Sequence, residues 1–169
     1  MVDNACVQSA DARADEDDRF MALALDEARR CLAWGDVPVG AVVVREGLVL
    51  GAAGNQRERL LDPTAHAEVL ALREAAGGAG TWRLDGCTVY VTLEPDAMCC
   101  GALVLARVNR LVFGAFDPKA GFAGSLGDLV RDSRLNHRLE VSSGVRADQS
   151  AGLLREFFAA RRRSETGAD

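Results

Sequence analysis

Two short segments of the chain contain the side chains whose types and spacing could support chemistry. One contains His66 and Glu68, and the other contains Asp96, Cys99 and Cys100. Each is predicted at the start of a helix, where backbone N–H groups and the helix dipole favour anions. Since Asp96 is three residues before Cys99 and four before Cys100, either pair lies on one helical face. The sequence therefore predicts a polar site built from two helix starts.

This combination of side chains is typical of metal-assisted hydrolysis. A histidine, a thiolate and a carboxylate make a three-ligand zinc site with a fourth position left for water. Glu68 beside such a water could move protons during its attack on a substrate. Taken singly, each residue is better explained by structure alone: His66 as a cap or surface residue, Asp96 as an N-cap and Cys99 as a small buried hydrophobe. The metal site is favoured because both segments begin a helix after a turn that contains proline.

Composition and charge limit the classes of protein to consider. The chain has 169 residues, 49% of them hydrophobic, and its 20 basic and 25 acidic residues give a net charge of −5. One domain with a sizeable core is expected, and a surface that is basic all over is excluded, although a local basic patch is not.

Five cysteines without a secretory segment do not suggest a disulfide framework, and two histidines exclude a histidine-rich metal cage. No apolar run approaches the roughly 20 residues that span a membrane, so a cytoplasmic protein is expected.

The pattern along the chain predicts a single α/β domain. A flexible acidic segment is expected over residues 1–17, the domain over 18–163 and a flexible tail over 164–169. Apolar periodicity and turn residues place helices over 19–34, 64–76, 96–106 and 151–163, and strands over 37–44, 48–51, 87–93 and 111–113. A glycine-containing loop is expected over 116–127. Strands that alternate with helices favour a layered sheet.

Between about residues 20 and 163 the sequence resembles the bacterial tRNA-specific adenosine deaminases, a family within the zinc-dependent cytidine-deaminase-like superfamily. The resemblance rests mainly on the segments 36–41, 62–68, 92–95 and 98–99. It implies a three-layer α/β/α fold, with a central mixed sheet of about five strands flanked by helices. It also implies a homodimer in which both subunits contact the RNA.

The resemblance further implies roles for individual residues. His66 and Cys99 would be ligands of one zinc ion per subunit, and Glu68 would relay protons. Asn55 would hold the flipped base, with Val37 and Leu93 in the pocket wall. The remaining positions match a loop beside the substrate strand and a helix that grips the anticodon stem-loop: Phe116, Asp117, Lys119, Phe157, Phe158, Arg161 and Arg162. The implied reaction is hydrolytic deamination of the wobble adenosine of a tRNA anticodon to inosine, with release of ammonia.

The chain departs from the family at Asp96, where a zinc-ligand cysteine is expected. Asp96 could bind the zinc itself, since its charge equals that of a thiolate. The site could instead be weakened or inactive, or Cys100 could supply the second sulfur. One alternative function follows from Asp96, a metal-poor relative that only binds RNA. Milder departures at Ala120, Phe122, Gly127 and Ser150 suggest another, a deaminase of free bases or nucleosides such as guanine or cytosine.

Overall fold

A five-stranded mixed sheet forms the centre of the molecule. The computed structural model describes the backbone of residues 4–166 and the side chains of residues 11–164. The strand order is β2-β1-β3-β4-β5, and the strands are β1 (Gly40–Arg45), β2 (Leu48–Gly54), β3 (Thr88–Leu93), β4 (Arg110–Ala115) and β5 (Glu140–Ser143). β1 pairs antiparallel with both β2 and β3, whereas β3, β4 and β5 are mutually parallel. The carboxyl ends of these three parallel strands therefore lie at one edge of the sheet.

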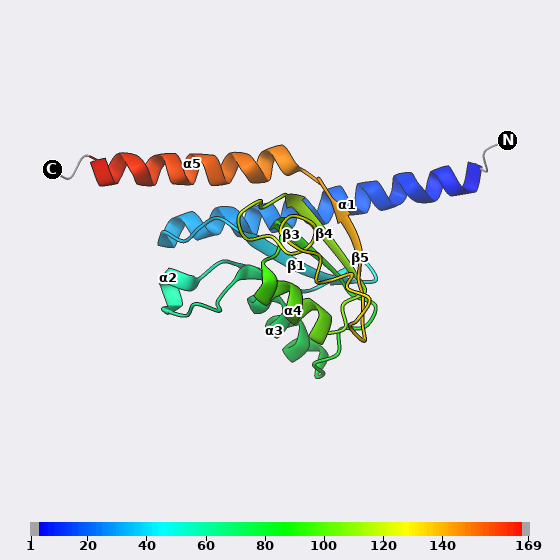
Figure 1. Cartoon of the computed structure of the whole chain (residues 1–169). Coiled ribbons are helices and arrows are strands. Elements are labelled where there is room, and N and C mark those ends of the chain that lie inside the picture. The colour runs from blue at the N-terminus through cyan, green and yellow to red at the C-terminus, as the bar shows by residue number, and fades with distance from the viewer. Residues whose placement is uncertain (1–3, 167–169) are drawn as a thin grey trace.

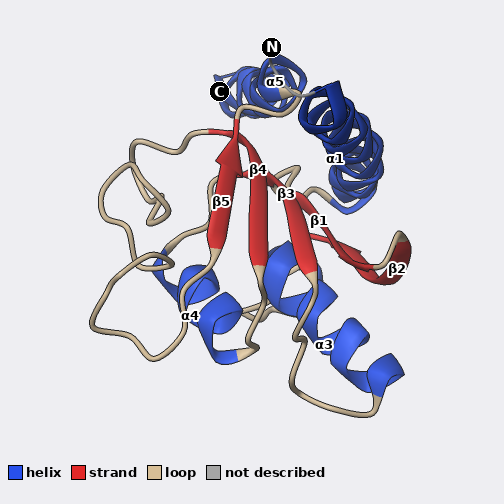
Figure 2. Ribbon diagram, turned by 90° about the vertical axis from the view of Figure 1, so that its right-hand side faces the viewer, coloured by secondary structure: helices blue, strands red, loops and turns tan. Residues whose placement is uncertain are grey.

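Helices cover both faces of the sheet, which confirms the predicted three-layer α/β/α fold (Figures 1 and 2). One face carries α1 (Asn4–Arg30) and α5 (Ala147–Thr166), which lie side by side, and the other carries α3 (Ala67–Ala79) and α4 (Ala97–Leu105). Each face has its own apolar core, which includes Phe20 of α1 and Tyr90 of β3 on one face and Leu103 of α4 and Phe113 of β4 on the other. The buried runs of β3 and β4 are expected for strands covered on both faces.

Two glycines allow the helices to approach the sheet closely. A Cβ atom at Gly40 of β1 would lie 2.0 Å from the backbone oxygen of Ala24 in α1. A Cβ atom at Gly51 of β2 would lie 2.4 Å from the backbone oxygen of Ala71 in α3. Because any larger residue would push the helices away, these positions fix how closely α1 and α3 lie on the two faces.

The first helix is longer than predicted, because α1 begins at Asn4 rather than at Arg19 and ends in a 3-10 turn over Cys31–Trp34. The acidic segment expected to be flexible is therefore helical from Asn4 onward, and residues 1–3 lie outside the described range. Long-range contacts explain the difference. Asp17 is buried against Arg110 of β4, with two nitrogen–oxygen distances of 2.6 Å. Arg13 pairs with Glu140 of β5.

Other elements differ from the prediction at their ends. The helix predicted to stop at Gly77 continues to Ala79, because Gly80 takes the left-handed conformation that closes a helix. The closing helix begins at Ala147 and runs to Thr166, so the predicted tail is helical up to that residue, and 167–169 lie outside the described range. The polar loop contains one short helix, α2 (Arg57–Leu60), that was not predicted. β5 was not placed either, since Val141 is its one large apolar residue.

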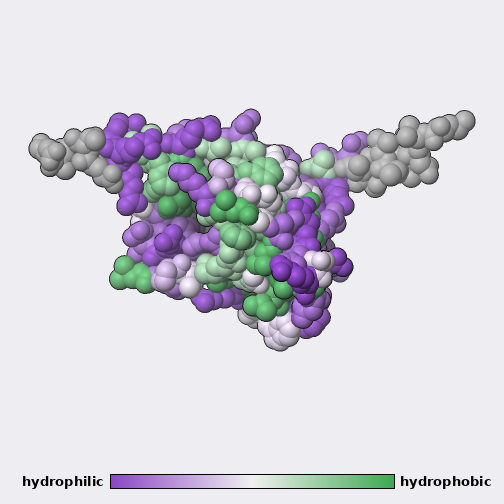
Figure 3. Space-filling model, viewed as in Figure 1, coloured by the Kyte–Doolittle hydropathy of each residue, from purple (hydrophilic) through white to green (hydrophobic). Residues whose placement is uncertain are grey.

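None of the helices in the described part of the chain is both long and apolar enough to cross a membrane. Hydrophilic residues cover most of the visible part of α5 (Figure 3). The amino-terminal end of α1 and the carboxyl-terminal end of α5 lie on opposite sides of the molecule (Figure 1).

Candidate metal and catalytic site

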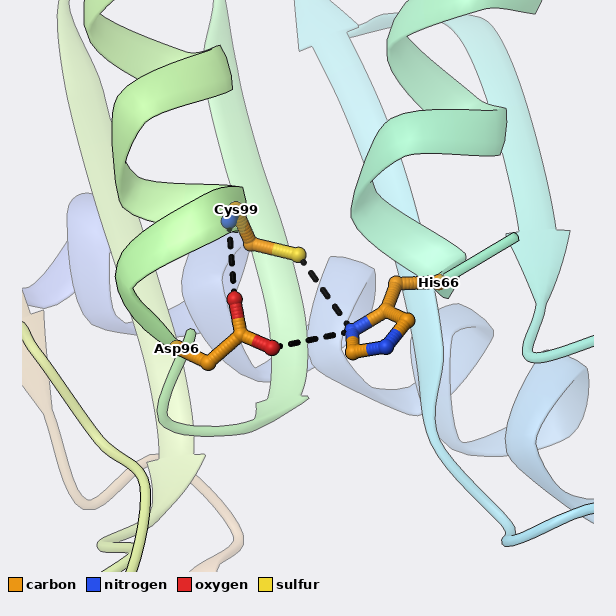
Figure 4. A group of neighbouring side chains, drawn as sticks. All are labelled: His66, Asp96 and Cys99. Atoms are coloured by element: carbon orange, nitrogen blue, oxygen red, sulfur yellow. Dashed lines mark hydrogen bonds and ion pairs between the residues drawn. The ribbon is translucent and has the colours of Figure 1, made fainter. Parts of the chain in front are cut away.

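Two helix starts meet on one face of the sheet, as the sequence predicted. His66 directly precedes α3 and has an extended backbone with φ −73° and ψ 150°. Asp96 directly precedes α4, three residues beyond the end of β3, with φ −73° and ψ −179°. Since α3 and α4 lie next to each other, their first residues face one another across a short gap (Figure 4). Residues that are 30 positions apart in sequence are thus brought into one cluster.

The cluster consists of one nitrogen, one oxygen and one sulfur donor. His66 Nδ1 lies 3.2 Å from Asp96 Oδ2 and 3.5 Å from Cys99 Sγ (Figure 4). Within the described part of the chain, these are the three histidine, cysteine or acidic residues whose donor atoms all lie within 4.8 Å of one another. The other carboxylate oxygen, Asp96 Oδ1, accepts the backbone N–H of Cys99 at 2.9 Å. Asp96 therefore caps α4 with one oxygen and offers the second to the cluster.

The donor set fits a zinc ion. Zinc–ligand bonds of about 2.0–2.3 Å in a tetrahedron place neighbouring ligand atoms roughly 3.3–3.7 Å apart. The His66–Asp96 and His66–Cys99 distances of 3.2 and 3.5 Å are close to that range. Cys100, the alternative sulfur ligand, has its Sγ 3.5 Å from the backbone oxygen of Pro95 and is not part of the cluster. The geometry thus favours Asp96 over Cys100 as the third donor.

The electrostatics of the cluster favour a bound cation. The hydrogen bond from His66 lowers the pKa of Asp96 to about 2, with a further contribution from the backbone N–H of Cys99, and the same pair raises the pKa of His66. Burial, followed by the charges of Glu68 and Asp96, raises the pKa of the Cys99 thiol far above its usual value. A thiol in that position becomes a thiolate ligand when a positive metal ion offsets the burial and the nearby carboxylates.

A cavity of about 210 Å³ opens beside the cluster. Four of the predicted substrate-binding residues line it together with His66, Asp96 and Glu68: Val37, Asn55, Leu93 and Asp117. Glu68 is 4% exposed, and burial raises the pKa of its carboxyl. A buried carboxyl with a raised pKa next to a metal cluster has the properties of a proton carrier.

The remaining predicted residues lie outside the cavity. Phe116 is 55% exposed and its ring packs edge-on against Phe113 at 5.0 Å, while Lys119 is exposed on the same loop. On α5, Phe157 is half-buried, Phe158 is 42% exposed, and Arg161 and Arg162 are exposed. Arg161 nevertheless lines a small hollow together with Val37 and Asn55, so α5 reaches the rim of the cavity.

Several residues of the cavity wall were missed by the sequence analysis. Arg57 and Ala120 line the cavity, as do Val39, Ala67 and Glu94. Arg57 stood in a polar loop with other charged residues, and no signal in the sequence distinguishes it. Glu94 did have a signal, because it is a carboxylate between a buried strand and a proline.

The fold and the site together define a metal-dependent deaminase of nucleobases, and comparison with known proteins gives the family. The model of the cytidine and deoxycytidylate deaminase zinc-binding region matches residues 14–115, so the chain belongs to that family. It is 46% identical over 153 residues to the tRNA-specific adenosine deaminase of Bacillus subtilis, covering 90% of this chain and 95% of that one. It is 43% identical to the enzyme of the same name from Haemophilus influenzae, over 92% of this chain and 91% of that one. The resemblance found in the sequence is therefore confirmed.

Solved structures support the same assignment. A structure from a study of A-to-I editing by tRNA:A34 deaminases at the wobble position superposes with a TM-score of 0.78 at 43% identity, covering 80% of this chain and 99% of that one. A guanine deaminase from Nitrosomonas europaea superposes with a TM-score of 0.73 at 26% identity, covering 84% of each chain. The chain is therefore more similar in sequence to the tRNA deaminase than to the guanine deaminase.

Proposed function

We propose that this protein deaminates the wobble adenosine of a tRNA anticodon to inosine. The observation that carries the proposal is that Glu68, His66 and Asp96 line one cavity of about 210 Å³, while Cys99 completes the donor cluster with His66 and Asp96. That volume is below the roughly 300 Å³ at which pockets for drug-sized ligands begin, so it suits a single flipped base. The similarity to tRNA-specific adenosine deaminases over 90% of the chain supports this substrate.

The proposed reaction replaces the amino group at C6 of adenine with an oxygen atom from water. His66, Asp96 and Cys99 would hold one zinc ion per subunit, which would supply a Lewis acid that lowers the pKa of water. Glu68 takes a proton from the attacking water and delivers it to the leaving amino group, which departs as ammonia. The C6–N bond breaks and a C6–O bond forms, so atoms balance without a further reactant.

The cavity wall positions the base for this attack. Asn55 is 5% exposed, and its backbone oxygen accepts the Nε1–H of Trp34 at 3.1 Å, which fixes the residue at the rim. Its amide side chain offers a donor and an acceptor to the edge of a purine. Val37 and Leu93 supply the apolar wall against which the face of the base can pack, and Asp117 lies on the opposite loop.

The surface around the cavity is proposed to hold the anticodon stem-loop. Exposed aromatic rings stack with unpaired bases, and arginines contact phosphates. The residues assigned to this surface are Phe116, Lys119, Phe157, Phe158, Arg161 and Arg162. Phe157 and Arg161 line one groove of about 430 Å³ that also contains Gly35 and Glu58, so α5 and α2 form its two sides.

A homodimer with one zinc site per subunit is part of the same proposal. An apolar groove of about 300 Å³ between α3 and α4 contains Trp82 and Leu105, which are 60% and 73% exposed. Such a surface is available for burial in an assembly. Light scattering is expected to give twice the 18.0 kDa of one chain, and a monomer at micromolar concentration would contradict the dimer.

The function is tested by incubating the zinc-loaded protein with an anticodon stem-loop that carries adenosine at the wobble position. Inosine is expected at that position, and Glu68→Gln is expected to abolish its formation without changing zinc content.

The alternative functions are tested by offering free guanine, cytosine and adenosine in parallel. Turnover of a free base with no inosine in the RNA would replace this function with the alternative suggested by the guanine deaminase relative. Binding of the RNA with no turnover would favour a relative that only binds RNA.

A further inference from the structure

Glu94 is a buried carboxylate that the proposed chemistry does not use. It follows β3 directly, and its backbone N–H donates to the oxygen of Ala115 at 2.8 Å, so it extends the pairing of β3 with β4 by one residue. Its side chain is 3% exposed. A carboxylate so deeply placed is stable only when hydrogen bonds replace its water.

Those hydrogen bonds all come from one loop. Glu94 Oε2 accepts the backbone N–H of Asp117 at 3.0 Å, and Oε1 accepts those of Ala123 at 3.0 Å and Ser125 at 2.9 Å. The hydroxyl of Ser125 donates to Oε2 as well. Residues that are 23 to 31 positions later in the chain are therefore gathered around one side chain. Bonds to a charged acceptor are among the strongest that a loop can make.

The loop lies directly on the carboxylate. A Cβ atom at Gly121 would be 2.3 Å from Glu94 Cδ, so no other residue type leaves room for the observed contact. The backbone N–H of Phe122 donates to the oxygen of Pro95 at 2.8 Å, and Gly121 bridges to Asp96. The loop is thereby fastened to the segment that carries the proposed metal ligand.

The same loop forms one wall of the cavity. Asp117 and Ala120 both line it. Asp117 Oδ1 accepts the backbone N–H of Lys119 at 2.9 Å and of Ala120 at 3.3 Å, which closes the turn that faces the cavity. Since Glu94 holds the N–H of Asp117, it sets where this turn stands relative to the opposite wall at Asn55.

We propose that Glu94 is a positioning residue, which holds residues 117–125 in place as one wall of the base-binding cavity and so governs how tightly the RNA substrate binds. This inference rests on the proposed function for its substrate, but the ordering of the loop by Glu94 is independent of it. Without the carboxylate, four donors lose their acceptor and the loop separates from the Glu94–Asp96 segment. The base then loses a wall, while the proposed zinc donors stay at the starts of α3 and α4.

The chain offers a specific probe of this loop, because Lys119 is its single lysine. A lysine-specific protease therefore cuts the native protein at one peptide bond, in the middle of the segment that Glu94 holds. Cleavage requires that the loop leave its place, so the rate reports the population of the released loop. In Glu94→Gln an amide nitrogen that cannot accept replaces one oxygen, so two donors lose their acceptor. The rate is expected to rise at least about tenfold, since loss of even one hydrogen bond to a charged group has that effect. Zinc content is expected to stay unchanged, and KM for the stem-loop to rise more than kcat falls.

Two further variants keep the test decisive. Asp17→Asn removes another buried carboxylate, 7% exposed against 3% for Glu94, that does not line the cavity, and shows how much loss of global stability alone accelerates cleavage. If Glu94→Gln does not fold, Gly121→Ala displaces the loop while leaving Glu94 intact, with Gly77→Ala as the control because a Cβ atom there meets open space. Gly121→Ala is expected to give the same increase in cleavage and KM.

The two proposals fail in different ways. Cleavage of Glu94→Gln and of Gly121→Ala no faster than that of Asp17→Asn and Gly77→Ala would overturn the positioning role. So would an unchanged KM in a protein whose loop is cut more quickly. Failure of the unaltered protein to form inosine would overturn the proposed function, whereas the protease measurement needs no substrate and would still decide the role of Glu94 in ordering the loop.

Discussion

Asp96 combines two tasks that a cysteine at this position would not combine. Its Oδ1 caps α4 through the N–H of Cys99, and its Oδ2 faces Nδ1 of His66. A thiolate sulfur is a weak hydrogen-bond acceptor, so a cysteine would bind metal but would cap the helix poorly. As a proposed zinc ligand, the carboxylate would keep the formal charge that a thiolate gives the ligand set, and it stabilises the helix start.

These two tasks can be separated by substitution. Asp96→Asn keeps a good helix cap but loses the charged ligand, so zinc per chain after dialysis against a chelator is expected to fall below that of the unaltered protein. Asp96→Cys is expected to hold zinc. Asp96→Ala loses both tasks, and its unfolding free energy in the metal-free state is expected to lie about 1 kcal/mol below that of Asp96→Asn. Metal analysis and urea unfolding measure the two effects.

Cys100 provides the control for these measurements. Its thiol faces the backbone oxygen of Pro95, so Cys100→Ala is expected to retain zinc, whereas Cys99→Ala loses it. Zinc retained in Asp96→Ala but lost in Cys100→Ala would identify Cys100 as the ligand instead.

The principal residues of the site could be predicted because they mark helix starts. His66 and Asp96 stand at the points where polar groups precede an apolar helical pattern, and helices that pack on one face bring their first turns together. The role of Glu94 could not be predicted, since its partners are backbone N–H groups, which every residue type except proline carries. Its role as an acceptor depends on the path of the loop that contains these donors. That path cannot be predicted, because the loop has no helical or strand pattern in its sequence.

At the scale of elements, long-range contacts decide where α1 begins. The stretch before Arg19 is rich in acidic residues and has no apolar stripe, so local patterns predict a flexible segment. Burial of Asp17 against Arg110, whose second nitrogen also donates to Ser142 at 2.9 Å, extends the helix across β4 and β5. β5 was missed for a similar reason, because its pairing with β4 stabilises a strand that has little apolar pattern of its own.

The Asp17–Arg110 pair is expected to be essential for docking α1 on the sheet. The two side chains are only 10% and 9% exposed, so removing one leaves the other charge buried without its partner. Arg110→Ala is expected to lower the free energy of unfolding by about 3–5 kcal/mol in urea titrations. Arg13→Ala removes a partner from an exposed pair with Glu140 and is expected to cost less than about 1 kcal/mol. Equal losses in the two variants would show that the buried pair has no special role.

At the scale of the whole molecule, buried thiols make stability depend on pH in the alkaline range. Burial raises the pKa of Cys31 to about 11 from an ordinary value of 9.0, and burial raises the pKa of Cys87 as well. Between pH 9 and about 11 the unfolded chain releases thiol protons that the folded chain keeps, so stability falls as the pH rises. The urea midpoint is expected to decrease from pH 8 to pH 10. The decrease is expected to be smaller in Cys31→Ala/Cys87→Ala, and an identical decrease in that variant would assign the effect to other groups.

The net charge of −5 is compatible with RNA binding only if the charge is unevenly distributed. The chain meets this condition, because α5 carries Arg161 at the rim of the cavity and Arg162 directly after it. Arg83 precedes β3 and Arg134 precedes β5, so both lie toward the amino ends of the parallel strands. Equal numbers of arginines can therefore be removed from either region with the same change in net charge.

This arrangement allows the proposed phosphate contacts of α5 to be tested by the salt dependence of RNA affinity. Each lost phosphate contact reduces the slope of log affinity against log salt concentration by about 0.7–0.9. Arg161→Gln/Arg162→Gln is therefore expected to weaken binding of the anticodon stem-loop and to reduce the slope by about 1.5. Arg83→Gln/Arg134→Gln is expected to leave the slope unchanged, although it alters the total charge equally. If both double variants weaken binding to the same extent with the same slope, the RNA responds to the overall charge, and α5 makes no phosphate contacts of its own.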